Sequence, residues 1–421
     1  MPDYKAPLRD MRFVLNEVLD IDGHYQGLGL EEVNSELLNA FLEEGAKFAE
    51  NELAPLNRSG DEEGCGFDNG VVTTPKGFKE AYAKYVEGGW PAMGGDPEFG
   101  GQGLPGSAGI AISEMTGTAN WSWSMYPGLS HGAVATIEEH GTDEQKQAYL
   151  PKLTSGEWTG TMCLTEPHCG SDLGILKTKA EPNADGSFNI TGTKIFISAG
   201  EHDMAENIVH IVLARLPDAP KGTKGISLFI VPKFMTDGNG GVGERNTVTC
   251  GSIEHKMGIK ASATCVMNFD GAKGYLIGPE NKGLNCMFTF MNFARLGTAI
   301  QGVAHAELGF QGGLTYAKDR LAMRSLSGPK NPEGPADPII VHPDVRRMLL
   351  TSKAFAEGGR ALVYLCAQLG DKVKLEKDEA ARKEADELMA LLTPIAKAFV
   401  TEAGLEAANH GVQIYGGHGF I

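Results

Sequence analysis

The chain has little of what would suit a nucleic acid or a membrane. Lys and Arg number 37 against 54 Asp and Glu, which gives a net charge of −17, and the sequence contains no dense basic block. Because a phosphate backbone is bound through a basic surface, nucleic acid is not expected as a partner. No uninterrupted apolar run approaches the roughly 20 residues that cross a bilayer, so no membrane span is expected.

Cysteine is scarce and scattered. The seven cysteines form no CxxC pair and no Cys/His cluster, so neither a disulfide framework nor a metal is expected. Cys163 and Cys169 are close in the sequence, but such a pair in a reducing compartment more often consists of small packing residues than of a redox couple. The N-terminus lacks the pattern of a secretion signal or an organelle presequence, which favours a bacterial cytoplasmic setting.

What is present is a chain of 421 residues, 42% of them hydrophobic, which is long enough for two or three domains around a large cofactor. The apolar spacing is helical at first, then β-branched with the period of strands, and then helical again. These patterns predict an α+β fold. Its parts are an N-terminal helical domain (1–159), a middle β-barrel-like domain (160–280) and a C-terminal helical bundle (281–421).

Three segments are expected to interrupt regular structure. Gly88 to Gly106 is too rich in Gly and Pro for a helix or strand, and a loop of this length usually has a function. Ser325 to Pro343 is a Pro-rich break between two of the later helices. Pro394 should kink or interrupt the last long helix because it lacks a backbone donor.

The loop MCLTEPHCGSD, from Met162 to Asp172, carries the strongest motif. Its hydroxyls, its proline and its glycine can offer backbone N–H groups and side-chain oxygens to a flat polar ligand, although an ordinary turn between two strands is the alternative. With the hairpin ITGTKIFIS (Ile190 to Ser198), it resembles the flavin-contacting signature of the acyl-CoA dehydrogenase family. Six fixed positions should recur by accident on the order of once per hundred thousand chains of this length: Thr165, Glu166, Pro167, Gly170, Ser171 and Asp172.

The resemblance continues in HGTDEQKQAYLPKL (140–153) and QIYGGHGF (413–420). It implies an FAD-dependent oxidoreductase that removes a proton beside a thioester carbonyl and transfers a hydride from the next carbon to flavin N5. It also implies three partners, namely an acyl-CoA substrate, an electron-transferring flavoprotein and further copies of the chain in a homodimer or tetramer.

The resemblance assigns flavin contacts to two neighbouring stretches. Met162, Leu164 and Thr165 should line the isoalloxazine ring. Phe196 stands where relatives usually carry Trp, and Ser198 where they usually carry Thr, so aromatic area and a hydroxyl are both retained. Taken without the resemblance, Phe196 is better explained as a core residue of a strand.

Substrate contacts are implied at the same loop and on a later helix. Gly170 and Ser171 match a pair at the mouth of the family's substrate cleft, where Ser171 can bond the pantetheine or phosphate part of CoA. Arg295, in MNFARLGTA, matches an arginine beside the reaction centre. A buried arginine there would hold a carboxylate ionised.

Two further elements resemble the family's contacts to the FAD of a neighbouring subunit, which implies at least a dimer. Arg320, in YAKDRLAMR, matches an arginine that reaches the FAD pyrophosphate, although the usual Thr and Phe are replaced two and three positions later. Gln413, Gly416 and Gly417 match a turn whose N–H groups approach the same cofactor.

The general base is not identified in the sequence. In most of the family it is a glutamate shortly after the GGxGF turn, a position that falls beyond Ile421, and in a minority it precedes the arginine, where this chain has Ala294. Glu166 is expected to be structural. A non-catalytic acyl-CoA or flavin-binding relative and an acyl-CoA oxidase therefore stay open beside the dehydrogenase.

The HCGSD variant of the motif, the N-terminal extension and the Pro-rich insertion at Ser325 to Pro343 suggest a substrate. They resemble the larger bacterial branch of the family, which includes members that oxidise 3-(methylthio)propanoyl-CoA during dimethylsulfoniopropionate degradation. The predicted function is α,β-dehydrogenation of a short acyl-CoA, with this thioether first and ordinary short or medium fatty acyl-CoA, as in fatty acid metabolism, as the alternative.

Overall fold

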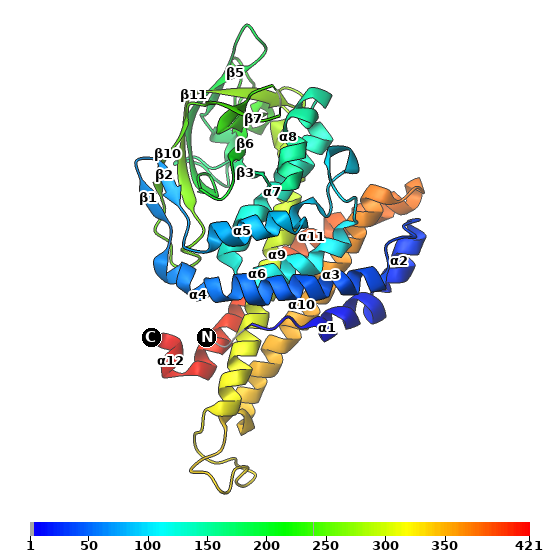
Figure 1. The fold of residues 1–421 in the computed structure, drawn as a ribbon, viewed down its shortest axis with the longest axis vertical. Helices are drawn as coiled ribbons and strands as arrows, with labels where there is room; N and C mark the ends of the chain where they lie inside the picture. The colour runs from blue at the N-terminus through cyan, green and yellow to red at the C-terminus, as the bar shows by residue number, and fades with distance from the viewer. Residues whose placement is uncertain (1–3, 239) are drawn as a thin grey trace. The chain divides into compact units, whose positions relative to one another are not determined.

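The computed structural model describes residues 4–238 and 240–421, which form two compact units. We call them the helical unit and the sheet unit. The helical unit holds the chain up to Pro55, Pro105–Trp121 and Arg295–Ile421, and the sheet unit holds Leu56–Leu104 and Ser122–Ala294. Helices precede and follow the strands along the chain, as the colours of Figure 1 show, which confirms the predicted fold class.

The sheet unit is built on a seven-stranded sheet in the order β3-β6-β7-β11-β5-β4, with β10 paired to β11. β3 and β6 are parallel, and the other pairs are antiparallel. The described strands form an open sheet that ends at β3 and β4, so it is not closed as a barrel. Its strands are β3 Trp158–Cys163, β4 Lys179–Pro182, β5 Phe188–Ser198, β6 Asn207–Ala214, β7 Ser227–Pro232, β10 Val248–Ile253 and β11 Thr264–Ile277.

Every residue of β6 and β7 is buried, which suits their continuous apolar sequences. Two short hairpins lie outside the main sheet. They consist of β1 Gly66–Asp68 with β2 Val71–Thr73, and of β8 Phe234–Thr236 with β9 Val242–Arg245.

Helices in the sheet unit support β3, the strand that leads into the signature loop. A capping box of Thr142 and Gln145 begins α8, and the Gln145 side chain also donates to the Leu276 carbonyl of β11 at 2.8 Å. α7 packs closely on β3, since a Cβ on Gly160 would lie 2.3 Å from that of Ala133. The helical elements here are α5 Phe78–Glu87, η3 Trp90–Ala92, η4 Pro97–Phe99, α7 Trp121–His140, α8 Asp143–Ser155, η5 Leu173–Ile175 and η6 Gly222–Gly225.

The helical unit contains three very long helices, of which α9 and α11 pack unusually closely. A Cβ on Gly302 would lie 2.2 Å from the Val400 carbonyl oxygen, so only glycine permits this approach. The long helices are α9 Gly283–Asp319, whose first turns belong to the sheet unit, α10 Pro343–Leu375 and α11 Glu379–Tyr415. The shorter ones are α1 Leu8–Arg12, η1 Phe13–Val18, α2 Ile21–Gly27, α3 Ser35–Phe48, η2 Ala49–Leu53, α6 Gly106–Ala119, η7 Ile339–Val341 and α12 Gly417–Phe420. Helix α4 Ala54–Glu63 begins at the end of the helical unit's first segment and lies mostly in the sheet unit.

Two expected interruptions are found and one is not. Gly88 to Gly106 forms only the short turns η3 and η4, and residues 320–342 form an irregular connection with the short turn η7 between α9 and α10. Helix α11, in contrast, continues through Pro394, which is exposed. The prediction of an interruption was wrong. A helix of 37 residues keeps enough backbone hydrogen bonds on either side of Pro394 to continue across one missing donor.

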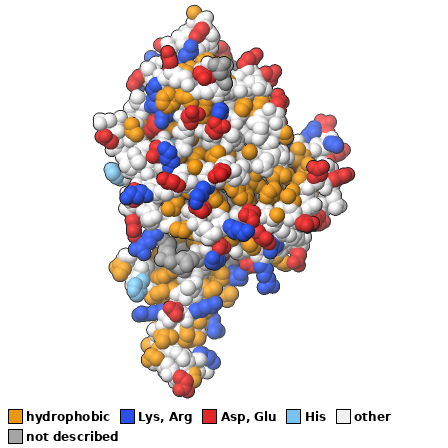
Figure 2. All heavy atoms as spheres, in the orientation of Figure 1, with side chains coloured by type: hydrophobic (Ala, Val, Ile, Leu, Met, Phe, Trp, Pro, Cys, Tyr) orange, Lys and Arg blue, Asp and Glu red, His pale blue; other side chains and the backbone are white. Residues whose placement is uncertain are grey.

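Helix α11 also carries an exposed apolar face. Among the described residues it is the one helix with the length and hydropathy to cross a membrane, and 28% of its most apolar window is buried. Core helices of soluble proteins can reach the same length and hydropathy, so these two properties are weak evidence for a membrane span. Figure 2 draws one side of the molecule, on which apolar and charged side chains are mixed. The exposed apolar residues of α11 are Leu388, Leu391, Ile395, Phe399 and Leu405.

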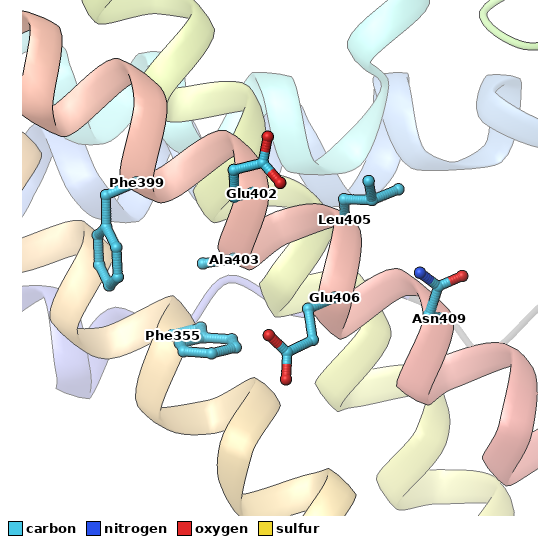
Figure 3. A pocket seen from close by; sticks show the side chains of 7 residues that line it. All are labelled: Phe355, Phe399, Glu402, Ala403, Leu405, Glu406 and Asn409. Atoms are coloured by element: carbon cyan, nitrogen blue, oxygen red, sulfur yellow. The ribbon is translucent and has the colours of Figure 1, made fainter.

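A hollow of about 290 Å³ lies between this face of α11 and α10. Figure 3 shows Phe355 of α10 beside residues of α11, with two carboxylates, Glu402 and Glu406, among the lining side chains. None of the residues assigned to flavin or substrate by the resemblance lines this hollow.

Candidate functional site

The signature loop begins where the buried strand β3 ends. β3 pairs with β6 along its whole length, so the chain leaves the sheet at Cys163 in a fixed direction. The loop then turns back on itself, because the backbones of Glu166 and Cys169 exchange hydrogen bonds of 2.8 and 3.0 Å. At its end Asp172 accepts from the Gly174 N–H and starts the short helix η5.

The Glu166 carboxylate holds this loop from inside. It is 3% exposed and accepts from the N–H groups of Lys177 at 2.7 Å and Thr178 at 3.0 Å, from the Thr178 hydroxyl at 2.6 Å and from Lys194 Nζ at 2.9 Å. Burial alone would raise the pKa of Glu166, but Lys194 and these donors hold it below its usual value. A carboxylate bonded to four donors is poorly placed to take a proton from a substrate, which supports a structural role.

Lys194 connects the loop to strand β5. Its ammonium is fully buried and donates to the Leu164 carbonyl at 3.0 Å as well as to Glu166. The next residue reinforces the connection, since the Ile195 N–H donates to the Thr165 carbonyl at 2.9 Å. Burial lowers the pKa of Lys194, while Glu166 opposes that shift. The loop is therefore fixed to β5 at adjacent positions.

Phe196 occupies a bulge in β5. Ile195 and Phe196 together face one residue of β11, since Met267 pairs with Lys194 and Cys265 with Ile197. The backbone of Phe196 has φ of 58°, which is an outlier for an aromatic residue, and such strain costs roughly 1–3 kcal/mol. The ring is 59% exposed. Phe196 is thus not a core strand residue, because the bulge turns its side chain outward.

The structure brings the other residues assigned to the flavin together around this bulge. Met162, Leu164, Thr165 and Ser198 are half-buried, whereas Gly170 and Ser171 of the loop are exposed. The Thr161 hydroxyl on β3 donates to the Ser198 carbonyl on β5 at 2.6 Å, which joins the two strands at this point. All of these residues belong to the sheet unit.

A second group of predicted residues lies together in the helical unit. The end of α9 meets the end of α11, because the rings of Tyr316 and Tyr415 are 4.6 Å apart and the Tyr316 hydroxyl lies 3.1 Å from Nδ1 of His418. Gly416 ends α11 with φ of 57°. Four residues assigned to the pyrophosphate of FAD are exposed there: Arg320, Gln413, Gly416 and Gly417.

Arg295 also belongs to the helical unit, near the middle of α9. It is half-buried, and of the two nearby phenylalanines Phe290 is buried whereas Phe293 is 54% exposed. A fully buried arginine is therefore not observed at this position.

Glu166, His168 and Cys169 could be taken for a metal site, since their ligand atoms lie within 4.8 Å of one another. The donors to the Glu166 carboxylate argue against this, because its oxygens already accept four hydrogen bonds. The His168 ring also has a partner, the Ile175 carbonyl at 3.0 Å. The cluster is better explained as part of the loop's internal bonding.

The exposed ring of Phe196 lies beside a polar loop that Lys194 and the backbone of β5 hold in place. Such an arrangement suits a flat, conjugated cofactor. The chain matches the acyl-CoA dehydrogenase N-terminal domain over residues 35–157, the middle domain over 161–272 and the C-terminal domain over 281–421. It belongs to the acyl-CoA dehydrogenase family. Membership confirms the predicted resemblance and the prediction of an oxidoreductase that uses FAD.

Two relatives match nearly the whole chain. One is 3-methylmercaptopropionyl-CoA dehydrogenase of Ruegeria pomeroyi, with 45% identity over 99% of this chain and 70% of that protein. The other is butyryl-CoA dehydrogenase of Syntrophomonas wolfei, with 37% identity over 100% of this chain and 70% of that protein.

Solved structures show the same architecture. Butyryl-CoA dehydrogenase from Megasphaera elsdenii superposes with a TM-score of 0.73 at 25% identity, covering 92% of this chain and 90% of that one. An acyl-CoA dehydrogenase of Bacillus anthracis complexed with FAD gives 0.74 at 25% identity, covering 93% and 63%.

The site fits such a cofactor. The bulge at Phe196 leaves its aromatic side chain exposed. A Cβ at Gly170 would lie 3.2 Å from the Thr165 side chain, so glycine avoids crowding within the loop. What the sequence missed is the support below the loop, namely Lys194 and Thr178. A lysine within an otherwise apolar and β-branched strand was the available signal.

Proposed function

We propose that the chain catalyses the FAD-dependent α,β-dehydrogenation of a short acyl-CoA, with 3-(methylthio)propanoyl-CoA as its preferred substrate. The observation that carries this proposal is the signature loop fixed to β5 by Lys194 beside the outward ring of Phe196. The 45% identity to a dehydrogenase of that substrate supports the choice of the thioether. The alternative is an ordinary short or medium fatty acyl-CoA, in keeping with the butyryl-CoA dehydrogenase relative.

The residues of the sheet unit would hold the ring system and orient the substrate. When bound, FAD supplies the two-electron acceptor. Phe196 would cover an apolar surface and exclude water, while the hydroxyls of Thr165 and Ser198 would donate at the polar edge, where negative charge develops. Ser171 would bond the CoA part of the substrate. The carbonyls of Thr165 and Ser198 are already bonded, to the Ile195 N–H and the Thr161 hydroxyl, so these two residues would need little ordering on binding.

In the helical unit Arg320, Gln413, Gly416 and Gly417 would contact the pyrophosphate of FAD bound to another copy. Their exposure at the joined ends of α9 and α11 supports this role. Arg295 would act near the reaction centre, where its charge would hold a carboxylate ionised. We assign no residue of this sequence as the general base.

The substrate test follows the colour of the flavin. Full-length protein should purify yellow, and anaerobic 3-(methylthio)propanoyl-CoA should bleach it faster than butanoyl-CoA or octanoyl-CoA. Bleaching should be reversed by an electron-transferring flavoprotein, and only slowly by air. Preference for butanoyl-CoA would favour the ordinary short-chain alternative.

Three other outcomes would contradict a dehydrogenase. Rapid reoxidation by oxygen with formation of peroxide would identify an acyl-CoA oxidase. A yellow protein that binds acyl-CoA but is never bleached would be a non-catalytic relative, and colourless protein that refuses added FAD would contradict the flavin site itself.

We also propose that the exposed face of α11 binds a second copy of the chain, in a homodimer or tetramer of a cytoplasmic bacterial enzyme. Leu388, Leu391, Ile395 and Phe399 follow one another at intervals of three or four residues, so they share one side of the helix. Exposed apolar stripes of this kind are typical of subunit interfaces. Assembly would also supply the second copy that the pyrophosphate contacts require.

Replacing one residue of the stripe should weaken assembly. Leu391 is 60% exposed, so Leu391→Glu should leave the fold intact and shift the protein toward monomer, because a charge would be buried in the interface. Light scattering after gel filtration measures the mass. Lys397→Glu, an exposed position on another side of α11, is the control and should retain the wild-type mass. Equal masses for all three proteins would place the interface elsewhere.

A further inference from the structure

The connection between α9 and α10, residues 320–342, is built around one side chain. We call this segment the α9–α10 loop. Among its residues, all of which the structure describes, only Asp337 is buried, and it is 0% exposed. Aspartate is rarely buried completely unless its oxygens are bonded. The other residues of the loop are exposed or half-buried, so burial of Asp337 reflects how the loop folds over it.

The Asp337 carboxylate collects four donors from along the loop. Oδ1 accepts from the N–H groups of Lys330 at 2.8 Å and Asn331 at 2.7 Å and from Nη1 of Arg324 at 3.3 Å, and Oδ2 accepts from the Ser325 N–H at 2.8 Å. Burial would raise the pKa of Asp337, but these donors outweigh it and lower the pKa to about 2. The carboxylate is therefore ionised at neutral pH.

The backbone on either side of Asp337 pairs with the residues that follow α9. The Ala322 N–H donates to the Asp337 carbonyl at 3.0 Å, and the Asp337 N–H donates to the Met323 carbonyl at 2.9 Å. Two residues on, the Ile339 N–H donates to the carbonyl of Arg320 at 2.8 Å. The backbone of Arg320 is thus held through its carbonyl by the returning segment that Asp337 anchors.

The loop uses its two arginines differently. Arg324 is occupied within the loop, since it donates to the carbonyls of Asn331 at 2.8 Å and Gly334 at 2.6 Å as well as to Asp337. Arg320 is exposed, and its guanidinium makes no hydrogen bond or ion pair with any residue that the structure describes. Its backbone is fixed while its charge remains available to an anion.

We propose that Asp337 is a positioning residue for the cofactor, because it fixes the backbone of Arg320 and so directs that guanidinium to the pyrophosphate of FAD. This inference rests on the proposed function, in which Arg320 binds those phosphates. The loop is then already ordered in the folded protein, so binding FAD costs no further conformational entropy there. The contact between Arg320 and the phosphates is stronger as a result. Asp337 itself touches neither cofactor nor substrate.

Asp337→Asn tests the proposal. Asparagine keeps one acceptor oxygen but turns an NH₂ group toward an N–H donor, so the loop cannot keep all of its bonds. FAD should bind the deflavinated full-length variant about tenfold more weakly, the size expected when one charge-assisted contact is weakened. Fluorescence titration with FAD measures this. Glu333→Gln is the matched control, since Glu333 is an exposed acid of the same loop, and it should bind FAD as the wild type does.

A double-variant comparison separates positioning from a general loss of stability. In an Arg320→Gln background the phosphate contact is already gone, so Asp337→Asn should cause no further loss of FAD affinity. An equal loss in both backgrounds, or wild-type affinity in Asp337→Asn itself, would overturn the proposal. Should Asp337→Asn fail to fold, Arg324→Gln leaves three of the four donors to Asp337 and should show a smaller loss with the same dependence on Arg320.

The wild-type protein distinguishes this inference from the function on which it rests. Wild type that binds FAD, with Arg320→Gln binding it as tightly, would remove the role of Arg320 and with it that of Asp337, while leaving the flavoenzyme intact. Wild type that does not bind FAD would contradict the proposed function directly.

Discussion

Lys194→Met should destabilise the protein by about 3–5 kcal/mol, the cost of removing one partner from a buried ion pair. Lys194 is fully buried and Glu166 is 3% exposed, so the remaining carboxylate would lose its buried cationic partner. The Leu164 carbonyl would lose a donor as well. The signature loop would no longer be fixed to β5, and FAD should be lost together with stability.

Denaturant unfolding and flavin content measure the two effects. Lys177→Met is the matched control, because Lys177 is exposed and bonds Glu166 only through its backbone N–H, so it should unfold and bind FAD as the wild type does. Adding Glu166→Gln to Lys194→Met should recover part of the lost stability, since the buried charge is then removed. Unchanged unfolding and flavin content in Lys194→Met would show that the loop is held by its backbone alone.

The signature loop could be predicted as one unit because the motif is local. MCLTEPHCGSD places its hydroxyls and glycine within a few residues of one another, and the structure keeps them in one loop. The support could not be predicted in the same way. Lys194 reaches Glu166 across 28 positions of sequence, and the contact depends on which strands are neighbours. The outward direction of Phe196 depends on a register shift with β11, which no pattern within β5 reveals.

Fold class was predictable from the change in apolar period, but the lengths of the last helices were not. Helix α9 runs unbroken from Gly283 to Asp319. Small residues explain this, because glycines on α9 and α11 allow the two backbones to pack closely, and this packing holds each helix over its full length. A glycine within a helix is expected to weaken it, but here the glycines form the surface on which the two helices pack.

A network of buried charged side chains in the helical unit could not be predicted from the sequence either. Arg360 of α10 is 0% exposed and donates to Glu114 of α6 at 2.6 Å and to Glu307 of α9 at 2.9 Å, and the Tyr364 hydroxyl donates to Glu114 at 2.8 Å. Burial raises the pKa of Glu114, although Arg360 opposes that shift. Three helices far apart in the sequence are therefore joined by one guanidinium.

Arg360→Met should cost about 3–5 kcal/mol of stability at neutral pH, because two carboxylates would be left buried without their shared cation. The matched control is Arg347→Met on the same helix, whose exposed pair with Asp344 should contribute about 0–1 kcal/mol. Denaturant midpoints measure both. Equal losses for the two variants would mean that water or a rearranged side chain takes the place of Arg360.

The pH dependence of the Arg360→Met deficit provides a second and sharper measurement. Without Arg360 the pKa of Glu114 should rise further in the folded protein, so the folded state binds a proton that the unfolded state, with a carboxyl pKa of about 4.3, has already released. Stability relative to wild type should then fall as pH rises above that value, because the native state holds more protons. The deficit should accordingly be smaller at pH 5 than at pH 8. A loss of packing alone would be the same at both pH values, so a pH-independent deficit would show that the charges of Glu114 and Glu307 are not what Arg360 compensates.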